Sequence, residues 1–137
     1  MWFLFAVLSS ITAALVAIFG KIGLSNVDST LATSLRAIIM AVAVFGLALF
    51  TGKFSGLSQI TGNNMLWIFL SGLAGAASWV FYFAALKMGD ATKVAAIDRT
   101  SIIFVVILAI LFLGEKLTWL KLFGAILIGI GAFLITR

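Results

Sequence analysis

Long stretches without a charged side chain constrain this sequence more than any other feature. Residues 2–20 carry none, and neither do residues 54–86 or 122–136. About 20 consecutive apolar residues are enough for a helix to cross the hydrocarbon core of a bilayer. Water-soluble domains are about half apolar and a quarter charged, whereas this chain of 137 residues is 64% apolar and 9% charged. We therefore expect an integral membrane protein.

Hydropathy, and the polar or glycine positions that interrupt it, predict five membrane-spanning helices. Unbroken apolar runs favour helices over a membrane β-barrel, whose strands alternate with period two. The predicted spans are residues 2–19, 31–50, 65–86, 93–113 and 117–136. Segment 55–64 is rich in Gly, Ser, Thr and Asn, so we expect a loop or an interfacial segment there. The loops leave no room for a soluble domain, and residues 1–137 are expected to form a single membrane domain.

The chain contains no cysteine and no histidine. This removes disulfides, thiol and imidazole nucleophiles and the usual zinc ligands from consideration. We expect no metal, no other cofactor and no enzymatic activity, because an acid–base pair would have to come from unusual residues. The nine basic residues are scattered singly despite a net charge of +5, so nucleic-acid binding is not expected.

Five spans place the two termini on opposite sides of the membrane. The basic residues in the loops and at the span ends are Lys53, Lys116 and Lys121 on the N-terminal side and Lys21, Lys87, Lys93 and Arg137 on the other. Basic residues favour the cytoplasmic side. The loops alone give three against four, whereas including Arg36 and Arg99 gives three against six and favours a cytoplasmic C-terminus. A bias this weak permits insertion in both orientations, which we state as a hypothesis.

Three charged residues lie inside predicted spans at a similar depth. Arg36 lies five residues beyond the start of the second span, and Asp98 and Arg99 lie five and six beyond the start of the fourth. Both spans start on the same side, so each residue would lie roughly 8–9 Å below that surface. An ionised residue at a helix centre costs roughly 2.5–3.5 kcal/mol. The three residues therefore either line a translocation path or lock the bundle, with Arg36 reaching headgroups and Asp98 paired with Arg99, Arg36 or a lysine.

Asp98 is the only acidic residue within a predicted span. It is therefore the one credible carboxylate for coupling transport to a proton or another cation. The polar residues around the fourth span have simpler expected roles. Asp90 and Thr92 are good N-cap residues, and Glu115 adjoins Lys116 in a turn, where we expect a solvated ion pair.

The third span carries small, hydroxyl and aromatic residues on one helical face. They are Ser71, Gly75, Ser78, Trp79 and Tyr82, at positions i, i+4, i+7, i+8 and i+11. Such a face can wall a pocket in which the rings stack a substrate and the Tyr82 hydroxyl forms a hydrogen bond. It can equally be an ordinary packing face, because small residues let helix backbones approach.

The fifth span carries a series of small residues that predicts close helix packing. Ala125 and Gly129 are four residues apart, and Gly124 and Gly131 are seven apart. Residues at these spacings let two helices approach closely, either within one subunit or between two subunits.

Short runs spread over nearly the whole chain are similar to those of a known family. They are Lys21-Ile-Gly-Leu, Thr33-Ser-Leu-Arg36, Ser78-Trp-Val-Phe-Tyr82, Ala96-Ile-Asp98-Arg99-Thr-Ser101, Leu113-Gly-Glu115-Lys-Leu and Gly124-Ala-Ile-Leu-Ile-Gly-Ile-Gly131. Together they resemble the EamA branch of the drug/metabolite transporter superfamily. Larger members of that family have ten helices in two inverted halves, and this chain is similar to one half. The resemblance implies a homodimer, possibly antiparallel, that transports small metabolites or drugs, often as an exporter.

Two departures from the family pattern affect what the resemblance implies. Close relatives tend to have a proline before the Ile-Asp and a lysine after the Asp, whereas this chain has no proline and has Arg99 in the lysine position. Without a proline the fourth span is expected to be straighter, and arginine offers a planar fork rather than a point charge. The small four-helix multidrug exporters of the superfamily carry a glutamate in the first span, and this chain has none there.

The sequence thus predicts a small-solute transporter that works as a homodimer by alternating access in the bilayer of a bacterial or archaeal inner (plasma) membrane. The expected cavity residues are Arg36, Ser78, Trp79, Tyr82, Asp98, Arg99 and Ser101. Their cationic excess favours an anionic or zwitterionic solute. Two alternatives stay open: a membrane subunit that packs against a partner without transporting, and a flippase subunit whose arginines bind the phosphate of a lipid carrier.

Overall fold

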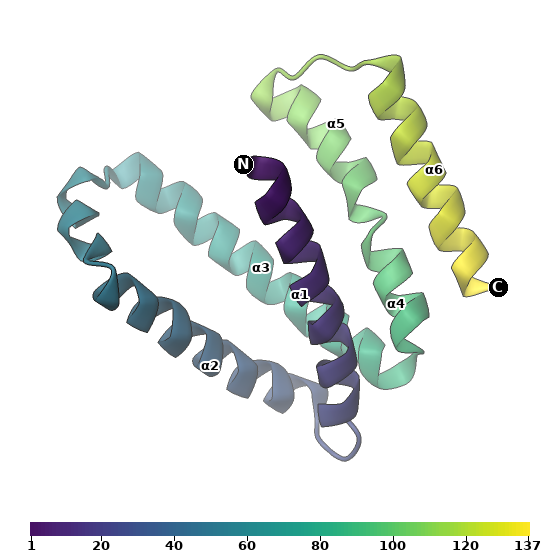
Figure 1. Ribbon diagram of the computed structural model, residues 1–137, viewed down its shortest axis with the longest axis horizontal. Helices are drawn as coiled ribbons and strands as arrows, with labels where there is room; N and C mark the ends of the chain where they lie inside the picture. The colour runs from purple at the N-terminus through teal and green to yellow at the C-terminus, as the bar shows by residue number, and fades with distance from the viewer. The chain divides into compact units, whose positions relative to one another are not determined.

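The computed structural model describes residues 1–137 and is all-helical, without a strand. Its elements are α1 (Trp2–Gly23), α2 (Ser29–Phe50), the 3₁₀ helix η1 (Lys53–Gln59), α3 (Gly62–Met88), α4 (Ala91–Asp98), α5 (Ser101–Leu113) and α6 (Trp119–Thr136) (Figure 1). Five spans are long and apolar enough to cross a membrane, with α4 and α5 together forming the fourth. The predicted all-α membrane fold with five spans is confirmed.

The helices extend beyond most of the predicted spans. α1 continues to Gly23, and α3 begins at Gly62 and ends at Met88. Hydropathy detects only the part of a helix that lies in hydrocarbon, whereas the backbone stays helical into the polar interface. Segment 55–64, expected as a loop or an interfacial segment, contains the end of η1 (residues 55–59) and the start of α3 (from residue 62).

The chain forms two compact units, which we describe separately. One contains residues 1–22 and 88–137, and the other contains residues 23–87. The expectation of one membrane domain over residues 1–137 stays a prediction.

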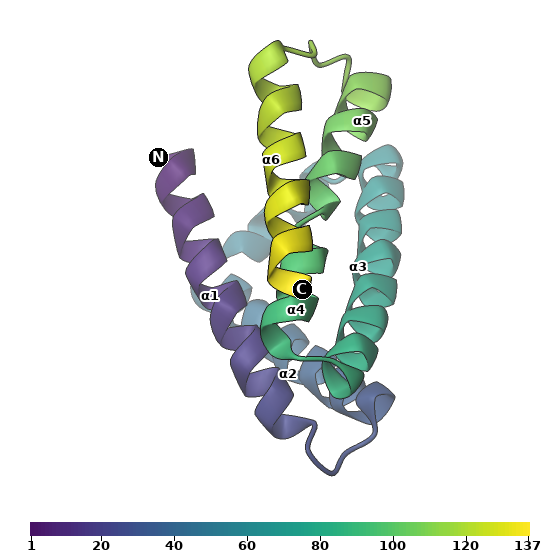
Figure 2. The same cartoon turned by 90° about the vertical axis from the view of Figure 1, so that its right-hand side faces the viewer.

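In the unit of residues 23–87, α2 and α3 run antiparallel and are joined through η1 (Figures 1 and 2). Asp28 caps α2, because its Oδ1 accepts hydrogen bonds from the backbone N–H groups of Thr30 (2.9 Å) and Leu31 (3.0 Å). The bond from Leu31, more than that from Thr30, lowers the pKa of the Asp28 carboxyl below its ordinary value. At its other end α2 stops where Gly52 adopts a left-handed backbone, with φ +65°.

Two lysines fasten the loops that follow α1 and α3. Within the unit of residues 23–87, Lys87 Nζ donates to the Val27 carbonyl at 2.7 Å. Within the other unit, Lys21 Nζ donates to the Gly89 carbonyl at 2.8 Å. Carbonyls near a helix C-terminus lack partners in the helix, and a lysine can satisfy them while its charge complements the helix dipole. Lys21 thus has a structural role at the end of α1.

In the unit of residues 1–22 and 88–137, α6 packs against α4 and α5. α5 and α6 lie side by side and antiparallel in both views (Figures 1 and 2). Gly114 ends α5 with a left-handed backbone (φ +66°). Thr118 begins α6, and its side-chain oxygen accepts a hydrogen bond from the Lys121 N–H at 3.3 Å.

The fourth span is interrupted between α4 and α5 although it contains no proline. The backbone N–H groups of Thr100, Ile102 and Ile103 each bond the carbonyl three residues back, at 2.9–3.3 Å, rather than the one four residues back. The Thr100 hydroxyl also bonds the Ile97 carbonyl at 2.7 Å. Threonine hydroxyls that bond back to the preceding turn often bend helices. The absence of proline therefore does not keep this span continuous.

Asp90 occupies the N-cap position of α4, as predicted, but its side chain forms no capping hydrogen bond. Thr92 does not cap the helix, because α4 begins at Ala91 and Thr92 lies inside its first turn. The cap interaction expected from these two residues is therefore not made.

Small residues provide half of the buried positions in the structure. Ala17, Ala109, Ala125 and Ala132 are four of the eight buried residues. A Cβ placed on Gly129 would lie 3.3 Å from Ile103 Cδ1. In membranes, where the solvent is itself apolar, such close approach is what associates helices. Ala125 is thus buried and Gly129 lies in close contact with α5 within the subunit.

Replacing Gly129 with valine should loosen the contact between α5 and α6. Overpacking a filled contact destabilises by about 1–3 kcal/mol, and a Cβ at position 129 would lie only 3.3 Å from Ile103 Cδ1. Gly131→Val is the matched control, because a Cβ at Gly131 meets nothing within 4 Å. Equilibrium unfolding in mixed detergent micelles, followed by circular dichroism, measures the difference. Equal losses in the two variants would contradict the packing described here.

Candidate functional site

The buried face of α3 differs in part from the face predicted from the sequence. Trp79 and Tyr82 are partly buried, as expected, but Ser78 is exposed. The face continues instead through Phe83, which is 3% exposed, and Leu86, which is fully buried. Sequence reasoning missed Phe83, although its spacing of four from Trp79 is the signal that could have found it.

An aromatic cluster on α3 holds the guanidinium of Arg36 from α2. Arg36 Cζ lies 3.6 Å from the centroid of the Trp79 ring and 5.4 Å from that of Phe83. The Trp79 ring meets Tyr82 edge-on, with centroids 5.6 Å apart and planes at 82°, and it meets Phe83 with centroids 6.0 Å apart. The structure thus brings Arg36, Trp79 and Tyr82 together within one unit. That they line a solute cavity stays a prediction.

The electrostatics of Arg36 are unusual for a cation inside a membrane span. The structure contains a single salt bridge, between Glu115 and Lys121, so no carboxylate neutralises Arg36. A cation over a tryptophan face gains roughly 2 kcal/mol when it is desolvated, which offsets much of the roughly 2.5–3.5 kcal/mol cost of placing it in hydrocarbon. A guanidinium that lies over a ring can still donate hydrogen bonds from its N–H groups. Those groups match carboxylate and phosphate oxygens in a bidentate geometry.

Besides Arg36, a second polar region of the spans lies at the junction of α4 and α5. Asp98 is partly buried, whereas Arg99 and Ser101 are exposed. The salt bridge between Asp98 and Arg99 that we considered from the sequence is not formed. Here the backbone N–H groups bond the third preceding carbonyl instead of the fourth. The carbonyls of Ala96 and Asp98 therefore accept no backbone hydrogen bond. Backbone carbonyls that lack a hydrogen bond are unfavourable in hydrocarbon. At membrane depth they are found only where protein or water surrounds them.

The two polar regions belong to different units of the chain. Arg36, Trp79 and Tyr82 lie in the unit of residues 23–87, and Asp98 and Arg99 lie in the other. The expectation that all three charged residues meet in one cavity stays a prediction.

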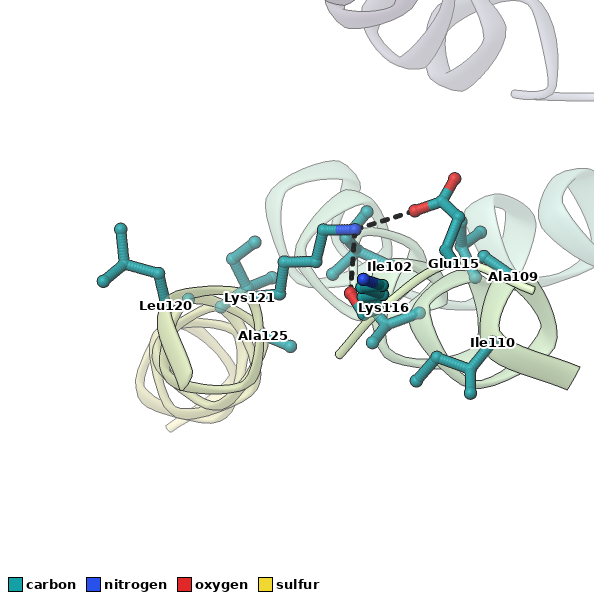
Figure 3. Close-up of a pocket in the computed structure, with 12 residues that line it drawn as sticks. Ile102, Ala109, Ile110, Glu115, Lys116, Leu120, Lys121 and Ala125 are labelled. Atoms are coloured by element: carbon teal, nitrogen blue, oxygen red, sulfur yellow. Dashed lines mark hydrogen bonds and ion pairs between the residues drawn. The ribbon is translucent and has the colours of Figure 1, made fainter. Parts of the chain in front are cut away.

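A groove of about 380 Å³ lies between α5 and α6. Figure 3 shows Lys121 reaching across its end, where Lys121 Nζ lies 2.8 Å from Glu115 Oε2 and 3.3 Å from the Lys116 carbonyl. The expected ion pair of Glu115 is thus formed with Lys121, and Lys116 contributes its carbonyl. The reason is the loop: Gly114 turns the chain sharply, and the Thr118 cap directs the first turn of α6 back toward Glu115.

The remaining glycines of the predicted packing face have open space around them. A Cβ on Gly75, Gly124 or Gly131 would meet nothing within 4 Å. A role for these three in contacts between subunits stays a prediction. No three acidic, histidine or cysteine side chains gather into a group that could hold a metal ion.

Comparison with known proteins agrees with these features. The model of the EamA-like transporter family matches residues 1–137. A protein of Sinorhizobium sp. named as an uncharacterized transporter in the cobO 3′ region is 42% identical over 134 residues, which cover 98% of this chain and 95% of that protein. No solved structure matches the chain. This multi-pass membrane protein therefore belongs to the EamA-like transporter family, as a half-size member with five spans.

Proposed function

We propose that this protein moves a small solute with an anionic or zwitterionic group across the plasma membrane, as a homodimer that works by alternating access. Export is the proposed direction. The observation that carries the proposal is the guanidinium of Arg36, which lies 3.6 Å above the Trp79 ring within a membrane span and has no carboxylate partner.

Arg36 is suited to recognise the charged group of the solute. A structural arginine in hydrocarbon is usually paired with an acid or reaches the headgroups. Arg36 instead lies over the Trp79 ring. Hydrogen bonds to charged groups contribute about 1.5–3 kcal/mol, and more of this is realised where water is scarce. Trp79 then fixes the orientation of the fork before the solute arrives, which lowers the entropic cost of binding.

The junction of α4 and α5 is the proposed place for coupling. The open carbonyls of Ala96 and Asp98 need water or protein around them, and a water-lined junction keeps the Asp98 carboxylate accessible to a proton or another cation. Interrupted helices near ion and substrate sites are a recurrent feature of secondary transporters. Arg99 and Ser101 follow directly and would line the same path.

A second copy of the chain is proposed to complete the path. One chain supplies five spans, and most of its large apolar side chains are exposed. The Sinorhizobium relative has a similar length, so a half-size chain is not peculiar to this sequence. Two copies in opposite orientations would reproduce the inverted repeats from which many transporters are built, and the weak charge bias of the loops permits this.

Replacing Arg36 with lysine should impair transport of an anionic solute by roughly 10–100-fold, because lysine keeps the charge but loses the bidentate fork. Proteoliposomes tested with a panel of carboxylates, phosphate esters, zwitterions and cations provide the measurement. Arg137→Lys is the matched control, because Arg137 also stands over a ring, with Cζ 4.9 Å from the centroid of Phe133, but lies at the chain end. Arg99→Ala should abolish transport, which tests the second polar region.

Wild-type rates in folded Arg36→Lys and Arg99→Ala proteins would contradict the proposed site. If no solute in the panel is transported or stabilises the purified protein, the reading as a non-transporting subunit is favoured. Activity that depends on a phosphorylated lipid carrier would favour the flippase subunit.

Single cysteines should reveal how the chain is inserted, because the native chain has none. We would place one at Gly56 in η1, where a Cβ meets open space, and another at Ser25 in the loop between α1 and α2. The two positions lie on opposite sides of the membrane. In an antiparallel homodimer, about half of each variant should react with an impermeant thiol reagent in intact cells, since both orientations coexist. Full labelling of one variant and none of the other would exclude the antiparallel homodimer.

A further inference from the structure

The groove between α5 and α6 contains none of the residues of the proposed transport site. Its walls are apolar along most of its length, formed by residues such as Ile102, Val106 and Ile110 of α5 and Ala125 and Ile128 of α6. Gly124 also lines it, and a Cβ there meets nothing within 4 Å, so the floor is open at this point. The groove is therefore an apolar cleft between two antiparallel helices.

One end of the groove is polar and carries excess positive charge. Glu115, Lys116 and Lys121 line it (Figure 3). Glu115 neutralises one lysine through the 2.8 Å contact with Lys121 Nζ. Lys116 makes no salt bridge, so the end of the groove keeps one uncompensated positive charge.

The polar end lies where two candidate spans end, which is where a membrane surface is expected. Glu115 and Lys116 lie in the loop that joins two spans, and Lys121 lies in the first turn of α6. The apolar walls extend from there toward the middle of the same two spans. A ligand that fits must therefore carry a negative charge at the interface and a hydrocarbon chain below it.

We propose that the groove binds an anionic glycerophospholipid of the surrounding bilayer, with one acyl chain between α5 and α6 and the phosphate group between Lys116 and Lys121. Phosphate oxygens accept hydrogen bonds from lysine ammonium groups, and basic pockets between membrane helices are known to suit anionic headgroups. The apolar walls favour an amphiphile over free phosphate, because a small ion would leave the groove below it unfilled.

Glu115 limits the strength of this site. Its carboxylate competes with the lipid phosphate for the Lys121 ammonium group. A lipid without a net negative charge competes less well and should bind more weakly. Removing the carboxylate charge should free Lys121 and strengthen binding of an anionic lipid. An increase in lipid affinity on removing this carboxylate is specific to the proposed site, because Glu115 would have little effect on a lipid bound elsewhere.

Native mass spectrometry of the purified full-length chain, titrated with dioleoylphosphatidylglycerol or dioleoylphosphatidylcholine, tests the proposal. Phosphatidylglycerol should bind more tightly than phosphatidylcholine. Lys116→Gln and Lys121→Gln should each weaken the phosphatidylglycerol complex roughly fivefold, since a lysine near an anionic membrane surface contributes about 1 kcal/mol. Glu115→Gln should strengthen it, and inorganic phosphate alone should not compete.

Two controls separate the groove from general charge attraction. Lys53→Gln removes a positive charge on the same membrane side outside the groove and should leave binding unchanged. Gly124→Leu should fill the floor and prevent binding, whereas Gly131→Leu on the same helix should not. Equal affinity for the two lipids, or retained phosphatidylglycerol binding in Gly124→Leu and the two groove lysine variants, would overturn the proposal. So would a dimer that becomes monomeric in Gly124→Leu, because a second copy would then occupy the groove.

Discussion

Hydrocarbon cannot form hydrogen bonds with a peptide backbone, and this constraint determines most of the structure. Each span satisfies its own N–H and C=O groups by being helical. Because the lipid is as apolar as the side chains, burial gives little drive for these helices to associate. The closest contacts are accordingly made by small residues: Ala109, Ala125 and Ala132 are buried, and Gly129 approaches Ile103.

Two polar features inside the spans depart from this rule and are therefore informative about function. Arg36 is a charge in a span, and the Trp79 face stabilises it without neutralising it. The junction of α4 and α5 leaves the Ala96 and Asp98 carbonyls outside the helical bonding pattern. Both features are unfavourable in lipid and acceptable beside water or a polar solute. They are therefore the strongest grounds for a solute path in this chain.

The sequence predicted the five spans because hydropathy reports directly on the lipid environment. It also singled out Arg36, Asp98 and Arg99, since a charge in an apolar run is conspicuous. The interruption at Thr100 was not predictable in the same way. Neither glycine nor proline marks it, and it depends on a hydroxyl that bonds the Ile97 carbonyl. Phe83 went unnoticed because an aromatic residue is ordinary in a membrane helix. The pairing of Glu115 with Lys121 depends on the loop conformation, which no spacing rule supplies.

The proposed transport path requires water at the junction of α4 and α5, as well as a solute at Arg36. The most direct test compares the reactivity of two single cysteines with a small charged methanethiosulfonate reagent in membrane vesicles. One replaces Ser101, next to the junction, and the other replaces Ile38 of α2, which lies a similar number of residues into its span and is 61% exposed. A thiol reacts as the thiolate, which forms in water and not in hydrocarbon. The account predicts rapid modification at position 101 and almost none at position 38. Equal, slow modification at both positions would contradict it.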